Sequence, residues 1–309
     1  MQRKFILSID GGGIRGILPA AALVELEKIT GRPARETFSF VAGTSTGALI
    51  AAAVAAGIPA TRIVQIYLQR TREIFSPGAP WNTIKRAATG SMYSTRKLYD
   101  VLAGELAAAR TWSVNDSPID LLITAKRVAD GKPWYFVRDK AANARTTGRF
   151  PLIDCVTASA AAPTYFSPWN IPEIGALADG GVGVTGNPVY QACVEAFYYT
   201  GEYNPQETTV ISMGTGRFIS EQNPRTLWGW LGWVLDEMFV SPGDQQTELV
   251  RRHFPEVEFH RLEPEIPKDI PMDDVGSLPL LQECAQRFAA AIDWKAMIAE
   301  PAISANVSN

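Results

Sequence analysis

Residues Lys4 to Ile29 read KFILSIDGGGIRGILPAAALVELEKI, and this stretch decides the fold. It begins with a nearly continuous apolar run, Phe5 to Ile9, which predicts a strand buried on both faces of a sheet. From Leu18 onward apolar residues recur at spacings of three and four, which predicts a helix that begins near Ile17. A turn of three glycines joins the strand to the helix.

These glycines, Gly11 to Gly13, leave backbone N–H groups bare at the start of the helix, an arrangement that favours an anion. The anion can be a bound phosphate or an oxyanion that forms only in a transition state. Residues 11–16 also satisfy the G-x-G-x-x-G pattern of dinucleotide sites. That alternative lacks an acidic residue at the end of the second strand, and it places the carboxylate of Asp10 near the pyrophosphate.

Composition and charge exclude several classes of protein. The chain has 309 residues, 46% apolar and 20% charged, which is typical of a globular protein. Its formal net charge is −3 without a basic block, so nucleic acid is not an expected partner. Three widely separated cysteines, Cys155, Cys193 and Cys284, predict neither disulfides nor a metal site and favour a cytoplasmic location. No secretory signal or transmembrane segment is evident, so we expect contact with a membrane only at its surface.

A second glycine turn, Gly43 to Gly47, reads GTSTG and matches G-x-S-x-G. It follows a short apolar strand and precedes the alanine-rich helix Ala48 to Gly57. Its glycines permit a sharp turn that exposes the hydroxyl of Ser45, and the N–H of Thr46 begins the helix. The serine is therefore a candidate nucleophile, or else a helix cap in an ordinary turn. If the first two strands are neighbours, the glycine amides of residues 11–13 face this hydroxyl.

A nucleophilic serine needs a base, and the sequence leaves two candidates. The only histidines are His253 and His260, and chain order permits a Ser45–Asp179–His253 triad. His253, however, lies in a predicted amphipathic helix, where a solvated histidine at the helix end is the simpler interpretation. The other candidate is Asp179 itself, which precedes Gly180 and Gly181. A free aspartate has a pKa of about 3.9 and is a poor base unless burial raises that value.

Strand and helix patterns alternate along the chain. This alternation predicts an α/β fold in which helices cover both faces of a mostly parallel sheet. Further strands are expected at 119–123, 134–137 and 209–213, and further helices at 61–75, 95–106 and 152–162.

Three motifs together resemble the patatin-like phospholipase family, which also includes relatives of the cytosolic phospholipases A. They are DGGGIRG at 10–16, GTSTG at 43–47 and DGG at 179–181. Secondary matches are ASAAAPTYF at 158–166, Asn187-Pro188 and SMGTGR at 212–217. The resemblance implies a three-layer α/β sandwich with a central mostly parallel, mixed sheet.

The resemblance also implies roles for individual residues. Ser45 would be the nucleophile and Asp179 its general base, in a dyad without histidine. The oxyanion hole would come from Gly11, Gly12 and Gly13 with the N–H of Thr46, and Arg15 would stabilise substrate charge. The remaining motif glycines are Gly16, Gly43, Gly47, Gly180 and Gly181. The implied reaction is hydrolysis of carboxylic esters of membrane lipids through an acyl-enzyme, without metal or organic cofactor. Acyl transfer to another alcohol is an alternative at the same site.

We expect one acyl hydrolase domain over residues 1–300, followed by a tail at 301–309. Within it, residues 218–243 differ in composition and contain Trp228, Trp230 and Trp233. This segment is either a helix that covers the core or a dimer contact, or it is a lid that meets lipid at the membrane interface. The sequence does not decide whether the chain forms a homodimer or needs an activator. It also does not decide which lipid head group is preferred or which acyl position is cleaved.

Overall fold

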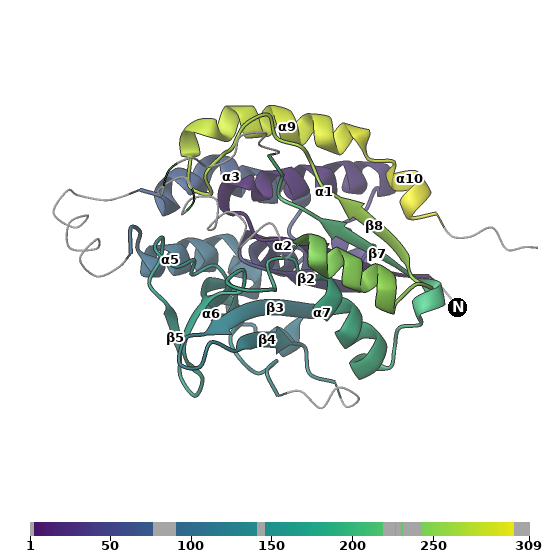
Figure 1. Ribbon diagram of the computed structural model, residues 1–309, viewed down its shortest axis with the longest axis horizontal. Helices are drawn as coiled ribbons and strands as arrows, with labels where there is room; N and C mark the ends of the chain where they lie inside the picture. Colours follow the sequence, from purple (N-terminus) through teal and green to yellow (C-terminus); the bar gives the residue numbers. More distant parts are fainter. Residues whose placement is uncertain are drawn as a thin grey trace, which may run out of the picture.

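One mixed sheet runs through the part of the chain that the computed structural model describes, residues 3–76, 91–140, 146–218, 226, 230 and 243–299 (Figure 1). Its strand order is β5-β6-β3-β2-β1-β7-β8, and β4 pairs with β3. β1, β2, β3, β7 and β8 run parallel to their neighbours in this group, whereas β4, β5 and β6 pair antiparallel. The strands are β1 (Lys4–Ile9), β2 (Phe40–Gly43), β3 (Asp120–Arg127), β4 (Pro133–Val137), β5 (Trp169–Ile171), β6 (Gly175–Asp179), β7 (Thr208–Met213) and β8 (Glu258–Leu262). The predicted mostly parallel, mixed sheet is confirmed.

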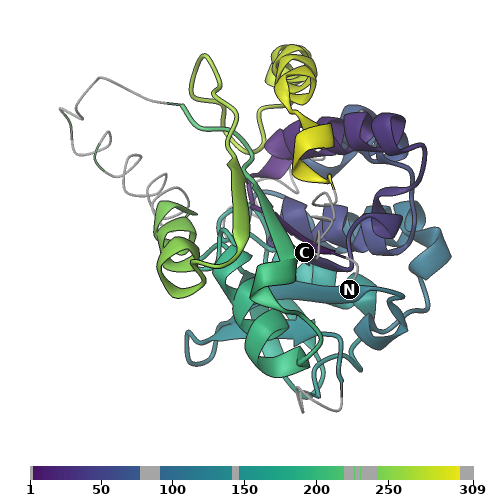
Figure 2. The ribbon, with the colours of Figure 1, turned by 90° about the vertical axis from the view of Figure 1, so that its right-hand side faces the viewer.

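Both faces of the sheet are buried. Successive residues of a strand point to opposite sides of the sheet, so one strand contributes side chains to both cores. On one face Leu7 and Ile9 of β1 join the larger hydrophobic core, and on the other Ile6 joins a smaller one with Phe40. α7 and a helix at 243–253 cover the smaller core, and the remaining long helices cover the larger one (Figure 2). The helices are α1 (Ile17–Thr30), α2 (Thr46–Ala55), α3 (Ala60–Ile74), α5 (Thr95–Glu105), α6 (Leu152–Ser159), α7 (Val189–Val194), α9 (Leu278–Ala291) and α10 (Trp294–Met297).

The predicted helices are present with small differences at their ends. A short 3-10 turn, Gly13–Gly16, comes before α1, whose last apolar position, Ile29, is 41% exposed. α6 ends at Ser159, earlier than expected, and the carbonyls of Ser159 and Ala161 accept from the N–H groups of Gly180 and Asp179. Sequence patterns did not predict β8 or α9, which packs along α1 (Figure 1).

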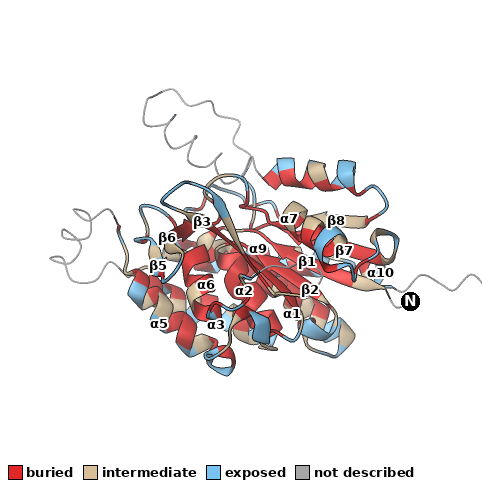
Figure 3. Cartoon of the chain, turned by 90° about the horizontal axis from the view of Figure 1, so that it is seen from below, coloured by how far each residue is buried: buried red, intermediate tan, exposed pale blue. Residues whose placement is uncertain are grey.

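Along one edge of β3 the paired strand changes from β2 to β6, and this change places the end of β6 close to the end of β2. β2 pairs with β3 only as far as Gly43 and Ile123. β4 occupies the opposite edge of β3 as far as Lys126, so β6 must take the edge that β2 leaves. Asp179, the last residue of β6, pairs there with Ala125. The strand ends and α2 lie in the buried interior (Figure 3).

Several predictions fall on residues that the structure does not describe. Most of the predicted lid at 218–243, including Trp228 and Trp233, lies outside the described residues, as does the tail at 301–309. Trp230 is described and is half exposed. Within the described ranges no helix combines the length and the apolar character needed to cross a membrane.

Candidate active site

The turn after β2 holds Ser45 in a strained conformation. Its φ of 56° and ψ of −121° lie in a region that side-chain-bearing residues rarely adopt, as at the serine of G-x-S-x-G turns. Both flanking glycines are required by space: a Cβ on Gly43 would lie 2.2 Å from the carbonyl oxygen of Gly47, and one on Gly47 would lie 2.2 Å from that of Ile9. The N–H of Ser45 donates to the hydroxyl of Ser159 at 2.9 Å, which fixes the turn against α6.

Asp179, the predicted base, lies next to this serine. Its side chain is buried, with 1% of the residue exposed, and it accepts a hydrogen bond from the hydroxyl of Ser45. The N–H of Gly181 donates to Oδ1 at 2.7 Å. Burial raises the pKa of Asp179 to about 6, although these two hydrogen bonds lower it. The carboxylate is thus a stronger base than a free aspartate and is still mostly ionised at neutral pH.

The glycine turn after β1 faces the serine. β1 and β2 are neighbours, and a Cβ on Gly11 would lie 3.3 Å from Cβ of Ser45. The N–H of Gly11 donates to the carbonyl of Gly186 at 3.0 Å, so it is already engaged. The N–H groups of Gly12, Gly13 and Thr46 have no acceptor among the described residues. Gly11 therefore does not offer the free N–H expected of it, and the role of the other three N–H groups stays a prediction.

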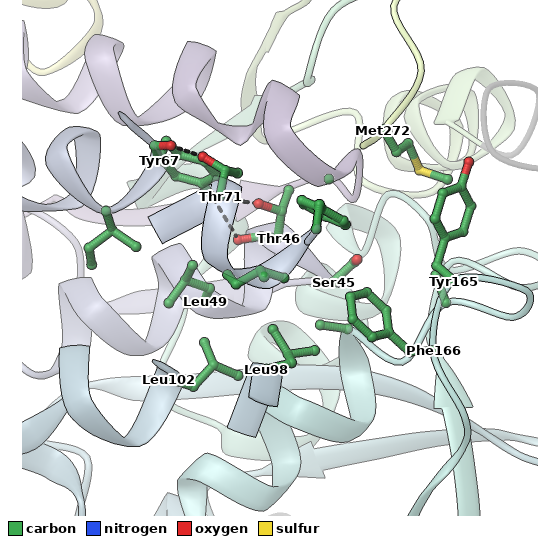
Figure 4. Close-up of a pocket in the computed structure, with 16 residues that line it drawn as sticks. Ser45, Thr46, Leu49, Tyr67, Thr71, Leu98, Leu102, Tyr165, Phe166 and Met272 are labelled. Carbon is green, nitrogen blue, oxygen red and sulfur yellow. Dashed lines mark hydrogen bonds between the residues drawn. The ribbon is translucent and has the colours of Figure 1, made fainter. Parts of the chain in front are cut away.

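An apolar cavity of about 70 Å³ opens at Ser45 (Figure 4). Leucines lie on one side of the serine and Phe166 and Tyr165 on the other. Three polar side chains in the wall are hydrogen-bonded: the hydroxyls of Thr46 and Tyr67 bond each other, and the hydroxyl of Thr71 donates to the carbonyl of Tyr67. The lining residues are Gly13, Ser45, Thr46, Leu49, Ile66, Tyr67, Thr71, Ile74, Phe75, Leu98, Leu102, Ala160, Ala162, Tyr165, Phe166 and Met272. The cavity is therefore suited to a hydrocarbon group.

Arg15 lies away from this apolar cavity. It lines a separate polar cavity of about 40 Å³, together with Arg217 and Arg261. Its Nε donates to the carbonyl of Gly12 at 3.4 Å, so it contacts the glycine turn from the polar cavity. The predicted role in stabilising substrate charge stays a prediction.

The two histidines have partners of their own. His253 is exposed, and its Nδ1 hydrogen-bonds the hydroxyl of Tyr190 at 2.7 Å. His260 contacts Glu258 at 3.1 Å. Neither is among the described residues that line the cavity at Ser45. In the described ranges, no three His, Cys, Asp or Glu side chains form a cluster that could hold a metal ion.

Sequence reasoning missed the residues that support the two turns. The hydroxyl of Thr44 donates to the carbonyl of Thr185 at 2.6 Å, and the hydroxyl oxygens of Thr44 and Thr124 lie 2.7 Å apart. The hydroxyl of Thr185 in turn donates to the carbonyl of Gly180 at 2.6 Å, which links the serine turn to the Asp179 turn. Only Ser159 had a signal in the sequence, because it lies in the small-residue segment 158–166.

Comparison with known proteins identifies relatives of this chain. The family model for patatin-like phospholipase matches residues 7–192. A cGAMP-activated phospholipase of Escherichia coli is 30% identical over 203 residues, 63% of this chain and 56% of the relative. One of Vibrio cholerae is 28% identical, over 74% of this chain and 69% of the relative. The human calcium-independent phospholipase A2-gamma is 25% identical over 87% of this chain and 36% of its own. The chain thus spans between about a third and two thirds of these relatives.

Solved structures give weaker likenesses. VipD from Legionella pneumophila has a TM-score of 0.46 at 12% identity, covering 94% of this chain and 67% of its own. ExoU has a TM-score of 0.41 at 13% identity, covering 94% of this chain and 52% of its own. The family match covers well over half of the chain and includes the motifs at 10–16, 43–47 and 179–181. The chain therefore belongs to the patatin-like phospholipase family.

Proposed function

We propose that this chain is a serine hydrolase that cleaves carboxylic esters of membrane lipids. The observation that carries the proposal is the strained turn that places Ser45 beside the buried carboxylate of Asp179 and in the wall of an apolar cavity. A serine hydroxyl is a weak nucleophile until a base accepts its proton. The names of the sequence relatives, which are phospholipases, agree with this reaction class.

In the proposed reaction Oγ of Ser45 attacks the ester carbonyl while Asp179 takes the hydroxyl proton. The N–H groups of Gly12, Gly13 and Thr46 stabilise the resulting oxyanion; loss of one such donor costs about 3 kcal/mol of barrier. Asp179 returns the proton to the departing alcohol, which leaves an acyl-serine. A water molecule then attacks the acyl-serine with Asp179 again as base, and the fatty acid is released.

The cavity supports a lipid substrate over a small polar ester. Each methylene group that moves from water into an apolar cavity contributes about 0.8 kcal/mol to binding. The side chains of Leu49, Leu98 and Leu102 offer such a surface next to the serine. We therefore assign the cavity to the acyl chain of the substrate.

Lipid hydrolysis by site variants tests the proposal. Ser45→Ala and Asp179→Asn are each expected to reduce release of fatty acid from phosphatidylcholine vesicles by about a thousandfold or more, measured by mass spectrometry. His253→Ala is the matched control and keeps wild-type turnover. Loss of activity in the His253 variant as well as in the Asp179 variant would contradict the dyad and favour the histidine triad.

A further inference from the structure

A buried ion pair joins the ends of β1 and β8 beneath the glycine turn. Nη1 of Arg261 donates to Oδ1 of Asp10 at 3.1 Å, and Nη2 donates to Oδ2 at 2.6 Å. The two side chains are only 14% and 11% exposed. Burial raises the pKa of Asp10, and the charge and hydrogen bonds of Arg261 oppose that shift. Asp10 is the residue directly before Gly11, so the ion pair anchors the chain where it enters the turn.

Thr215, two residues beyond the end of β7, also contacts the glycine turn. The hydroxyl of Thr215 donates to the carbonyl of Gly11 at 2.6 Å. A Cβ on Gly12 would lie 2.1 Å from that hydroxyl oxygen, so the turn packs directly on Thr215. Because both backbone groups of Gly11 are hydrogen-bonded, the peptide that leads to Gly12 cannot rotate freely.

Arg261 also links its ion pair with Asp10 to the loop that contains Thr215. Its Nη1 donates to the hydroxyl of Ser212 on β7 at 2.8 Å, and its Nη2 contacts the carboxylate of Glu263. Glu263 accepts from the N–H of Gly216 at 3.2 Å, in the same loop as Thr215. One guanidinium therefore contacts the ends of three neighbouring strands: β1, β7 and β8.

We propose that Arg261 is a positioning residue for the reaction, which acts by fixing the orientation of the N–H donors of Gly12 and Gly13. This inference rests on the proposed function. A buried ion pair is weak evidence for a stabilising role, because desolvation of the charges offsets their attraction. It does fix geometry, since a planar guanidinium binds a carboxylate through two parallel hydrogen bonds that the point charge of a lysine does not reproduce.

Two variants test the inference on the intact chain with p-nitrophenyl butyrate as substrate. Arg261→Lys keeps the charge and loses the paired geometry, and Thr215→Val keeps the volume and loses the hydrogen bond to Gly11. For Arg261→Lys we expect kcat to fall by about ten- to a hundredfold and KM to change by less than about twofold, because only the transition state uses the donors. The rate at which a fluorophosphonate labels Ser45 falls in parallel, and Thr215→Val has a smaller effect in the same direction.

Asp120→Asn is the matched control, because Asp120 is also a buried aspartate in an ion pair, with Lys140 at 2.7 Å. It is expected to lower Tm and to leave kcat unchanged. If the Arg261 and Thr215 variants lose Tm but keep kcat, the role is only structural and the inference is wrong. Should Arg261→Lys fail to fold, unchanged kcat in Thr215→Val overturns it alone. Turnover by Ser45→Ala would instead show that the proposed function itself has failed.

Discussion

At the scale of single residues, the basicity of Asp179 controls the proposed chemistry. Its pKa of about 6 predicts that kcat/KM rises with pH and levels off above about 7, because only the ionised carboxylate accepts the proton of Ser45. Initial rates on a soluble ester between pH 4 and 9 measure this profile. His253→Ala should give the same midpoint. A midpoint near 4 would mean that burial does not perturb the carboxylate in solution.

Ser159 is the residue that holds the strained serine turn in place. Ser159→Ala removes the hydroxyl that accepts from the N–H of Ser45. We expect kcat to fall by about tenfold with little change in KM, because the nucleophile is displaced and the cavity is not. Ser117→Ala is the control, since Ser117 is also buried but hydrogen-bonds the carbonyl of Ile119 instead. Equal values of kcat in the Ser159 and Ser117 variants would show that Ser159 has no role in the reaction.

Sequence reasoning found the residues of the candidate site whose signals are local. Gly43, Ser45 and Gly47 share one turn, and the spacing of that turn between strand and helix is legible in the sequence. The hydrogen bond between Ser45 and Asp179, by contrast, depends on how β6 pairs with β3. Arg261 had no signal, because nothing near it in the sequence indicates that its strand ends beside Asp10. Contacts between distant parts of the chain are set by register and packing, and one sequence does not display them.

At the scale of elements, α2, α3 and α5 each contribute side chains to the wall of the apolar cavity. Leu102 of α5 is 2% exposed and lines the cavity. Leu102→Phe adds volume there and is expected to lower kcat/KM for long-chain esters relative to acetyl esters, by about fourfold for each methylene group excluded. A series of p-nitrophenyl esters from two to sixteen carbons measures the ratio.

The control for this variant is Tyr99→Phe on the same helix, because Tyr99 stacks on Trp169 and is not a lining residue. It should keep the wild-type preference for chain length. If Leu102→Phe also keeps it, the acyl chain lies elsewhere.

At the scale of the whole molecule, the buried carboxylate links stability to pH. The pKa of Asp179 is raised in the folded state from 3.8 to about 6, so the folded state binds the proton more tightly than the unfolded state. Its contribution to the free energy of unfolding is full below pH 4 and is lost as pH rises through 6. The total loss is about 3 kcal/mol.

Urea unfolding of wild type and Asp179→Asn at pH 4 and pH 7 measures this contribution, because the other titrating groups cancel in the comparison. The variant is expected to gain about 3 kcal/mol relative to wild type between the two pH values. Asp100→Asn, at an exposed position on α5, should show no such gain. A constant difference between wild type and Asp179→Asn would contradict the raised pKa.

The reach of one guanidinium across three strand ends has a consequence during translation. A ribosome makes Ser45 about 200 residues before Arg261, a delay of roughly ten to forty seconds at ordinary rates of synthesis. During that time the nascent chain already contains Ser45 and later Asp179, but it lacks Arg261, which anchors the glycine turn. Under the proposed function, the chain therefore gains activity on lipid esters only after β8 has been made.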